Sequence, residues 1–505
     1  MIPTGSRSLL LWGFVASLKA EATHISTQSK PIVISESVPG DAGIPLDSFV
    51  SFSFELSSWP DFAGNLSHPN NFTYNLMNNI GKLQGSMPIA RVGGNTQDIA
   101  IFDESQKTSI IGVIRPNISA DYPTIITIGP SFFESYQTMP NGTKFTHGFN
   151  MGANSSAARS ATWASVPYAC KAIGSNLDFW EYGNEPDLFH ASGYRRDNWT
   201  ETDYVSEWIN GTNTIEQAVK TACPDLFGSK FMAPSFAGIG VDSYFTLGPV
   251  EAWKQGINKN GNVGIVSSHN YMGVSTNLGI TLQGTLMNHS NVIVKADAQL
   301  NVSRGIRELG TSLDPDLPFI LGEHNSLARQ GRPGLSNSFG AALWGVDWNL
   351  YLASKNISRS HMHQGTNYRY QSWQPIQTNL STIGTKPPYY GNLAVAAFLH
   401  KPSPSTRLHV AHLDSSTESA AQYAAYTNNT LTRLLVVDLH TYNTTANNFT
   451  TPFARPKDAF DYELDEGRPV RMANATREEV LNIDEKGMLS VEIPWSSAAI
   501  VELEC

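Results

Sequence analysis

The feature that most constrains the fold is an alternation of short apolar segments with longer mixed segments, which runs from about residue 48 to residue 398. Short apolar runs that end at Gly, Pro or polar residues predict buried strands, and the stretches between them predict helices. We expect strands at residues 49–56, 88–92, 123–129, 177–183, 230–235, 264–268, 318–322 and 359–364, and helices that include 157–173, 203–221, 291–310 and 336–354. Eight strand–helix units predict an α/β fold, a (β/α)8 TIM barrel with enlarged loops. A doubly wound open sheet is the alternative, but no glycine-rich phosphate loop follows any strand.

The alternation stops at about residue 398, and short strands separated by turns follow it. They are LHVAHL, AQYAAYT, TRLLVVDLH, MLSVEIP and AAIVELE, the last two predicted at residues 489–493 and 498–504. This texture predicts an all-β sandwich. We therefore divide the chain into a signal peptide at residues 1–22, an N-terminal segment at 23–45, the barrel at 46–398 and the sandwich at 399–505. The strand predicted near residues 31–35 of the N-terminal segment is expected to join the sandwich.

The N-terminus has the pattern of a secretory signal peptide. Arg7 precedes an apolar run at residues 9–18 that is too short to span a bilayer, and Ala20-Glu21-Ala22 offers a small-x-small cleavage site. A buried N-terminal helix is the alternative. No later apolar run reaches roughly 20 residues, so we expect no membrane anchor and a secreted, extracellular protein.

Sequons and cysteines agree with secretion. The motif Asn-x-Ser/Thr occurs fifteen times, which predicts N-linked glycans on asparagine. The three cysteines, Cys170, Cys223 and Cys505, are too few for a disulfide scaffold and form no zinc motif. We expect one disulfide, Cys170–Cys223, although the sequence alone does not decide the pairing.

Charge limits the partners of the chain. Lys and Arg total 34 against 44 Asp and Glu, a formal charge of −10, which argues against nucleic acid and against long polyanions held in a basic groove. One anionic sugar bound locally remains compatible with this balance. We expect no cofactor, no metal and a monomer or weak oligomer.

Two predicted strands end on a carboxylate. The segment NLDFWEYGNEPD at 176–187 carries Glu185 after its apolar run, and PFILGEHN at 318–325 carries Glu323. The C-terminal ends of barrel strands meet at one mouth, so both carboxylates are expected there. An ordinary acidic turn is the alternative for an isolated Glu-Pro, but glycoside hydrolysis needs such a pair, one as proton donor and one as nucleophile or base.

The order of several motifs resembles a known family. Asn-Glu-Pro at 184–186 followed later by Gly-Glu at 322–323 is similar to the pattern of clan A retaining glycosidases. More closely, the chain resembles glycoside hydrolase family 79, the family of β-glucuronidases and heparanases. The other segments that carry the resemblance are RVGGNTQD at 91–98, SHNY at 268–271, the stretch from Glu323 through Leu335-Ser336, and TNY at 366–368.

The resemblance implies roles for the residues around both carboxylates. Glu185 is the expected general acid/base and Glu323 the expected nucleophile. Asn184 is expected to bind the sugar 2-hydroxyl, Tyr271 to orient Glu323, and His269 to line the same subsite. A packed core histidine is the alternative for His269.

The same resemblance implies a subsite that reads a uronic acid. Tyr368, with backbone amides around Gly365, Thr366 and Asn367, is expected to receive the carboxylate of the sugar, and Glu55 to accept from its 4-hydroxyl. Tyr370 and Arg369 lie beside Tyr368 and are alternatives for that role. For Asp98 the alternative is a purely structural role, either capping backbone groups or pairing with Arg91.

Two departures from the family pattern matter. Arg329-Gln330-Gly331 stands where relatives carry Gly-Gly, and the chain lacks the basic clusters that hold a long polyanion. The resemblance implies a retaining β-glucuronidase that acts through a covalent glycosyl-enzyme, and the lack of basic clusters favours an exo-enzyme that removes terminal β-linked glucuronic acid from glycans or glucuronide conjugates. Tolerance for a 4-O-methyl group stays open. Another clan A hydrolase, such as a β-glucosidase or β-xylosidase, and a non-catalytic carbohydrate-binding protein are the alternatives.

Overall fold

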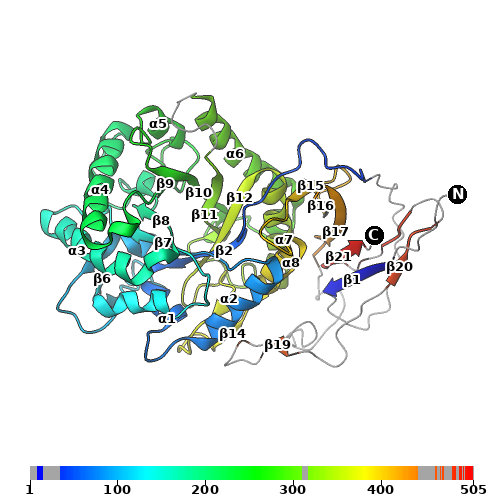
Figure 1. Cartoon of the computed structure of the whole chain (residues 1–505), viewed down its shortest axis with the longest axis horizontal. Helices are drawn as coiled ribbons and strands as arrows, with labels where there is room; N and C mark the ends of the chain where they lie inside the picture. Colours follow the sequence, from blue (N-terminus) through cyan, green and yellow to red (C-terminus); the bar gives the residue numbers. More distant parts are fainter. Residues whose placement is uncertain are drawn as a thin grey trace.

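The centre of the molecule is a closed barrel of parallel strands with helices outside it (Figure 1). The computed structural model describes residues 8–14, 34–309, 317–441, 461–462, 467, 469–470, 480–484, 488–491, 493 and 495–503. The barrel strands are β2 (Val50–Glu55), β3 (Ala90–Gly93), β7 (Phe145–Phe149), β8 (Leu177–Tyr182), β9 (Phe231–Phe236), β10 (Val263–Val274), β11 (Phe319–Ala328) and β12 (Ile357–Gln364). The predicted (β/α)8 barrel is confirmed.

Helices connect the barrel strands and cover their outer faces. They are α1 (Trp59–Ala63), α2 (Asn71–Gln84), α3 (Ser156–Ile173), α4 (Glu201–Ala222), α5 (Pro249–Lys254), α6 (His289–Glu308), α7 (Phe339–Ser354) and α8 (Pro387–Phe398). Local sequence sets their starts: Thr200 and Asp203 form a reciprocal capping box at α4, and Ser338 accepts the Ala341 amide at α7.

The barrel strands place polar side chains inward and apolar ones outward. In β2, Phe52 and Phe54 belong to the apolar core, while Ser53 and Glu55 form hydrogen bonds with groups on other barrel strands and loops. Because side chains alternate along a strand, one sequence supplies both the core and the polar interior. The barrel interior can therefore hold charged groups that water does not reach.

The third barrel strand differs from the sequence prediction. Residues 123–129 were expected in the barrel, but Ile125–Ile128 forms β6 of a separate sheet with β4 (Ala100–Phe102) and β5 (Ile110–Val113). The barrel position belongs to β7, which carries Thr146 and His147 and lacks an apolar run. The Tyr136 hydroxyl bonds to Nδ1 of His147 at 2.5 Å, which satisfies a polar group that would otherwise be costly to bury.

A six-stranded antiparallel sheet packs beside the barrel; five of its strands follow the barrel in the chain and β1 precedes it. Its order is β15 (Leu408–His412), β16 (Ala420–Thr427), β17 (Thr430–Asp438), β21 (Ala498–Leu503), β1 (Ser8–Phe14) and β20 (Val480–Asn482). One face packs on α7, which is buried on all sides because it lies between the barrel and this sheet (Figure 1).

The other face of the sheet meets the N-terminal segment. Ile34, Val38 and Ala42 pack against Ala411 and Tyr426, and Gly43 forms a β-bridge with Val410. Residues 34 and 35 form no strand, and 31–33 lie outside the described residues.

The rest of the predicted sandwich is seen only in part. Short strands β18 (Asp461–Tyr462) and β19 (Pro469–Val470) pair with each other, while residues 442–460 and 471–479 lie outside the described parts of the chain. The strand predicted at 489–493 is not found in the described residues there. Asp484 instead hydrogen-bonds to the backbone of Met488 through both its amide and its carboxylate, which makes a turn.

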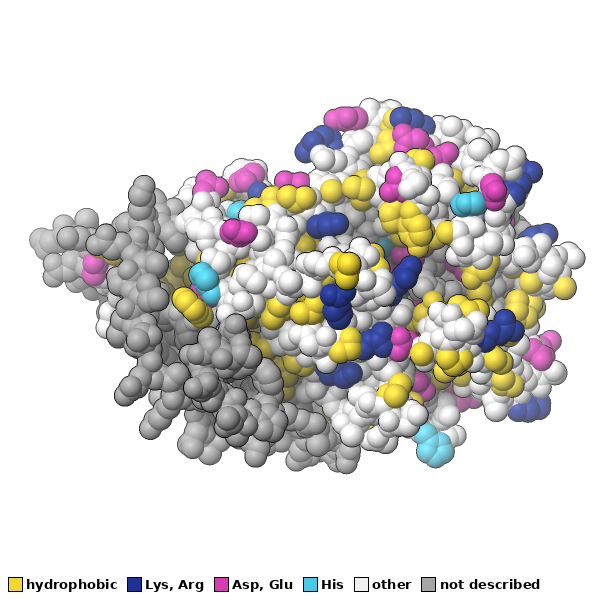
Figure 2. Space-filling model, turned by 180° about the vertical axis from the view of Figure 1, so that it is seen from behind, with side chains coloured by type: hydrophobic (Ala, Val, Ile, Leu, Met, Phe, Trp, Pro, Cys, Tyr) yellow, Lys and Arg dark blue, Asp and Glu magenta, His cyan; other side chains and the backbone are white. Residues whose placement is uncertain are grey.

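Two further predictions concern covalent links and the surface. The disulfide Cys170–Cys223 is confirmed and joins the end of α3 to the end of α4, whereas Cys505 lies outside the described residues. Within the described ranges, no helix is long and apolar enough to cross a membrane. On the face in Figure 2, Lys and Arg side chains lie singly or in small groups among acidic and uncharged ones.

Candidate active site

The two carboxylates singled out in the sequence meet inside the mouth of the barrel. Glu185 follows the end of β8 at Tyr182, and Glu323 lies within β11, in register with His269 of β10. One carboxylate oxygen of each glutamate and one ring nitrogen of His269 all lie within 4.8 Å of one another. A short separation of two carboxyl groups, about 5–5.5 Å, is typical of glycoside hydrolysis with retention, whereas inversion needs about 6.5–9.5 Å.

The backbone at Glu185 is held in an uncommon conformation. Its φ of 51° and ψ of 52° lie in the left-handed region, and Gly183 just before it has φ of 91°. A non-glycine residue in this region costs of order 1–3 kcal/mol, so the surrounding structure must hold it there. The Glu185 amide donates to the Ser235 carbonyl at 2.9 Å, which ties this turn to the end of β9.

Arg91 of β3 holds Glu323 from inside the barrel. Its Nη1 donates to Glu323 Oε2 at 2.7 Å and to Ser53 Oγ at 2.9 Å, and its Nε donates to Glu181 Oε2 at 2.9 Å. Its Nη2 donates to Asn184 Oδ1 at 2.7 Å. The side chain is fully buried, so a single cation serves two carboxylates and the amide beside Glu185. Such charge-assisted bonds are strong and fix the geometry of their partners.

Three more side chains contact the carboxylate pair. The Tyr271 hydroxyl donates to Glu323 Oε1 at 2.8 Å, and His363 Nδ1 lies 3.6 Å from Glu323 Oε2. His269 Nδ1 lies 3.0 Å from Glu185 Oε1. His269 Nε2 is buried without a hydrogen-bond partner among the described residues, which leaves that nitrogen for a ligand.

These surroundings push the pKa values of the two carboxyl groups apart. Burial, followed by the negative charge of Glu323, raises the pKa of Glu185 to about 8. Burial alone would raise the pKa of Glu323 too, but the charges of His363 and Arg91 and the bond from Tyr271 outweigh it and hold this pKa well below its usual range. Burial lowers the pKa of His269 to about 4, so its imidazole is neutral at ordinary pH. Near neutrality one carboxyl group is protonated and the other is ionised, which suits an acid beside a nucleophile.

Glu55 lies in the same cleft with its carboxylate bound on both sides. Oε1 accepts from the Thr96 amide at 2.8 Å and from its hydroxyl at 2.5 Å. Oε2 lies 3.1 Å from the Tyr368 hydroxyl, which donates to it, and 3.4 Å from His363 Nε2. The structure therefore brings Glu55 and Tyr368 together, as expected for residues of one subsite.

The turn at 365–368 is close to the site, but its amides are already used. The Thr366 amide donates to Ser58 Oγ at 3.0 Å, and the Asn367 amide donates to Gln374 Oε1 at 3.0 Å. A ligand carboxylate expected on these two amides would therefore have to displace protein acceptors. Gly365 has a different requirement: a Cβ there would lie 2.3 Å from the Tyr368 ring, so glycine lets the tyrosine fold back over the strand end.

The contacts of Asp98 and Arg369 decide between the roles that the sequence left open for them. Asp98 does not pair with Arg91; its carboxylate accepts the amides of Met151, Gly152 and Asn184 at 2.7–3.1 Å. Burial raises the pKa of Asp98 to about 7 despite these three bonds. Arg369 forms a two-point ion pair with Asp121, so its charge is already matched.

Sequence reasoning missed three residues of the site. Glu181 precedes the catalytic motif in the same strand, and a lone carboxylate inside a buried apolar run was a usable signal. His363 was a usable signal too, because His361 and His363 alternate along a predicted strand. Tyr122 showed no signal in the sequence that points to the site. Its side chain hydrogen-bonds with Asn95, and burial and then the charges of Glu55 and Glu185 raise its pKa.

Glu185, His269 and Glu323 also have the spacing of metal ligands. The donor set is a poor fit to a cation, because Arg91 already places a positive charge on Glu323. The arrangement suits proton transfer and nucleophilic attack.

Similar proteins are known by sequence. A β-glucuronidase of Aspergillus niger is 46% identical to the chain, covering 98% of this chain and 98% of that protein. A β-glucuronidase of Neurospora crassa is 44% identical, covering 93% of this chain and 96% of that protein. No protein-family model matches the sequence.

Solved structures share the architecture at low identity. A 4-O-α-L-rhamnosyl-β-D-glucuronidase from Fusarium oxysporum has a TM-score of 0.72 at 21% identity, covering 93% of this chain and 99% of that one. A family 51 α-L-arabinofuranosidase of Bifidobacterium longum has a TM-score of 0.57 at 14% identity, covering 93% and 99%. These likenesses support the fold.

Proposed function

The chain belongs to the family of fungal β-glucuronidases, and we propose that it hydrolyses terminal β-linked glucuronic acid with retention of the anomeric configuration. The observation that carries the proposal is the pair Glu185 and Glu323, with carboxylate oxygens within 4.8 Å and pKa values shifted in opposite directions. The order of its motifs supports placing it in glycoside hydrolase family 79, together with the heparanases.

The proposed reaction has two steps. Ionised Glu323 attacks the anomeric carbon while the bond to the leaving oxygen breaks, and Glu185 donates its proton to that oxygen. The sugar is then esterified to Glu323. In the second step Glu185, now ionised, takes a proton from a water molecule. The oxygen of that water attacks the anomeric carbon, the bond between the sugar and Glu323 breaks, and Glu323 is released as a carboxylate.

The contacts of each carboxylate suit its proposed role. Arg91 and Tyr271 bond to different oxygens of Glu323 and keep it ionised and oriented for attack. Burial keeps Glu185 protonated for the first step. When Glu323 becomes an ester its charge disappears, so the pKa of Glu185 falls and the residue is ready to act as a base.

The remaining side chains are assigned to the sugar. Asn184 is proposed to bind the 2-hydroxyl, since Arg91 holds its carbonyl oxygen in place. His269 Nε2 has no partner among the described residues and is available for a hydrogen bond with another hydroxyl. Glu55 is proposed to accept from the 4-hydroxyl and Tyr368 to donate to the sugar carboxylate, for which the Tyr368 hydroxyl would have to leave Glu55 Oε2, to which it now donates. The Thr366 and Asn367 amides would likewise have to leave their protein acceptors.

Release from chain ends is favoured over internal cleavage. The carboxylate of Glu55 is buried and accepts from Thr96 and Tyr368, so the group proposed to meet the 4-hydroxyl is a carboxylate and not a cation that could hold a further anionic sugar. The net charge of −10 also argues against a long polyanion in the cleft.

Secretion and glycosylation are part of the proposal. Residues 1–22 have the pattern of a signal peptide and fifteen sequons follow. Strand β1 lies within residues 8–14, so the mature chain proposed here lacks that strand.

A turnover assay tests the function. We expect p-nitrophenol release from the β-glucuronide to exceed release from the matched β-glucoside and β-xyloside at about pH 4–6, where one carboxyl group is protonated and the other ionised. Preference for a neutral sugar would favour another retaining hydrolase and would contradict the proposal that the cleft recognises a uronic acid. No release from any of the three would favour a carbohydrate-binding protein without catalysis.

A further inference from the structure

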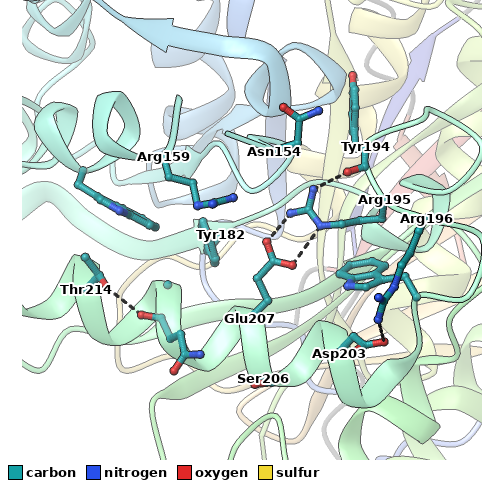
Figure 3. Close-up of a pocket in the computed structure, with 14 residues that line it drawn as sticks. Asn154, Arg159, Tyr182, Tyr194, Arg195, Arg196, Asp203, Ser206, Glu207 and Thr214 are labelled. Atoms are coloured by element: carbon teal, nitrogen blue, oxygen red, sulfur yellow. Dashed lines mark hydrogen bonds and ion pairs between the residues drawn. The ribbon is translucent and has the colours of Figure 1, made fainter. Parts of the chain in front are cut away.

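A second pocket lies outside the barrel mouth, between α3 and α4 (Figure 3). Its volume is about 660 Å³, within the range of small-molecule sites. Its lining comes from the segment just before α3, from α3 and α4, from the end of β8 and from the loop between β8 and α4, and it includes Arg159, Trp163, Tyr182, Arg195, Arg196 and Glu207. Neither catalytic carboxylate is among these residues.

The pocket and the catalytic cleft share one loop. Residues 183–200 leave β8, carry Glu185 into the cleft, and then supply Tyr194, Arg195 and Trp199 to the pocket. Arg195 Nη2 donates to the Met151 carbonyl at 2.7 Å, which fixes the loop against the residue after β7. The pocket is therefore lined in part by the same loop that carries Glu185.

The floor of the pocket is aromatic. The Trp163 and Tyr182 rings lie 5.8 Å apart, and Arg195 stacks 5.3 Å from the Trp199 ring. Gly211 lets α4 pack directly on the Tyr182 ring, because a Cβ there would lie 2.1 Å from it; Tyr182 is therefore buried, and Trp163 is the partly exposed ring of this pair. An aromatic face beside amide and hydroxyl groups suits a sugar ring, which has an apolar face and a polar edge.

Of the three arginines that line the pocket, two are paired with carboxylates and the third, Arg159, has no carboxylate partner among the described residues. Arg195 forms an ion pair with Glu207, and Arg196 lies 3.7 Å from Asp203. Arg159 reaches from α3 toward Tyr182 in Figure 3 and has no carboxylate partner among the described residues; its one hydrogen bond there is to the Ala153 carbonyl at 3.3 Å. Arginine binds carboxylates through two parallel hydrogen bonds.

We propose that this pocket is a second, non-catalytic binding site for an acidic saccharide, with a uronic acid ring on Trp163 and its carboxylate on Arg159. The inference rests on the proposed function, because it supposes a substrate that carries more than one uronic acid. Such a site would hold a branched acidic glycan near the cleft while its terminal sugars are removed. It would not contribute to the cleavage of a simple aryl glucuronide.

Binding to protein with a blocked cleft tests the proposal. Full-length enzyme is first labelled at Glu323 with a 2-deoxy-2-fluoro glucuronyl fluoride and then titrated with an aldobiuronic acid, a disaccharide of glucuronic acid and xylose, by calorimetry. We expect measurable binding that Arg159→Met weakens about five-fold or more, as loss of a partly screened charge-assisted hydrogen bond predicts. Trp163→Ala should weaken it similarly. The matched control is Lys171→Met, which removes the same charge from the other end of α3.

A neutral ligand and an aryl substrate complete the design. Xylobiose should bind more weakly than the aldobiuronic acid in the wild type, and Arg159→Met should remove that difference. Turnover of p-nitrophenyl glucuronide should be equal in wild type and Arg159→Met. No binding to the labelled enzyme, or equal binding by Arg159→Met and wild type, overturns the second site and leaves the proposed function intact.

Two outcomes separate this inference from its premise. If the enzyme is neither labelled nor active on the aryl glucuronide, the proposed function fails, and the same titration of unlabelled wild type against Arg159→Met still decides whether the pocket binds. Asn154 and Asn210 on the pocket rim are both sequon asparagines. The inference therefore requires these two of the fifteen sequons to be unmodified, and a glycan found on either by peptide mapping overturns it, because its first sugars would fill the entrance.

Discussion

At the scale of single residues, Glu185 and Glu323 show how one functional group takes two roles. Both are buried, and burial taken alone would raise the pKa of each carboxyl group. Cations and donors are gathered on Glu323, through Arg91, His363 and Tyr271, while the closest partner of Glu185 is the neutral His269. The different partners therefore assign the nucleophile and the acid.

This division of roles predicts that activity lost on replacing Glu185 depends on the quality of the leaving group, whereas activity lost on replacing Glu323 does not. Glu185→Ala should lower kcat/KM about 10²–10⁴-fold on a glucuronide with a poor leaving group, since general acid catalysis contributes about that factor. On a dinitrophenyl glucuronide the first step should be nearly unaffected, because that leaving group departs without a proton. Glu323→Gln should abolish turnover of both substrates. Steady-state kinetics on the two substrates makes the comparison, and equal losses for Glu185→Ala on both would contradict its role as acid.

The pKa values predict the alkaline side of the pH profile. Activity requires Glu185 protonated and Glu323 ionised, so kcat/KM on a poor leaving group should hold through neutral pH and fall as pH rises through about 8. A pH–rate profile measures this limb, and Glu185→Gln with an activated substrate should lack it. A limb near the ordinary glutamate pKa of about 4.3 would show that the cleft does not raise the pKa of Glu185.

How much of the site the sequence predicts depends on how each residue acts. Glu185 and Glu323 could be predicted because each follows or interrupts a recognisable strand and the barrel brings strand ends together. Arg91 was visible in a motif, but its partners could not be chosen, since Glu181 and Glu323 lie 90 and 232 positions away in the chain. Tyr122 lies in a loop that only the folded chain places over the cleft.

At the scale of elements, burial rather than local pattern decides which segments form the barrel. The β6 segment is strongly apolar and pairs in a small sheet, whereas β7 is partly polar and enters the barrel. A sequence pattern records which side chains are apolar, but the partner that satisfies His147 lies on another element. The other seven barrel strands follow predicted segments, although their patterns differ: β11 begins with the apolar run FILG, β2 alternates as VSFSFE, and β12 reads ISRSHMHQ.

Close packing of α4 on β8 predicts a sharp effect of one methyl group. Gly211→Ala would place a Cβ 2.1 Å from the Tyr182 ring, and overpacking of this kind destabilises a fold by about 1–3 kcal/mol. Gly345→Ala in α7 is the control, because its Cβ would meet nothing within 4 Å. That change should stabilise the protein by roughly 0.5–1 kcal/mol through helix propensity. Urea unfolding compares the two variants, and a Gly211→Ala protein as stable as wild type would refute the close contact.

At the scale of the whole molecule, the barrel and the C-terminal sheet are joined by a buried polar cluster. His289 Nδ1 lies 2.9 Å from Asp347 Oδ1, and the Tyr423 hydroxyl of β16 donates to the same oxygen at 2.5 Å. His289 Nε2 lies 2.9 Å from His412 Nε2 of β15. The contact is therefore specific as well as apolar, and it links α6 and α7 of the barrel to two strands of the sheet.

The titration of His412 predicts that this contact weakens in acid. Burial, followed by the charges of His289 and Lys355, lowers the pKa of His412 to about 4 against the opposite pull of Asp347 and Asp41. An unfolded histidine has a pKa of about 6.5, so between about pH 6.5 and 4 the unfolded chain binds a proton that the folded chain does not. The contribution of His412 to stability is therefore complete above about pH 6.5 and is lost as pH falls toward about 4.

Unfolding across pH measures this linkage. The free energy of unfolding of wild type should fall more steeply between about pH 6.5 and 4 than that of His412→Gln, whatever the stability of the variant at neutral pH, because the slope reports only the difference in bound protons. His68→Gln, at an exposed loop histidine, should keep the wild-type slope. Equal slopes for wild type and His412→Gln would mean that His412 binds its proton equally in both states, and the acid sensitivity of the junction between barrel and sheet would then have to come from other groups.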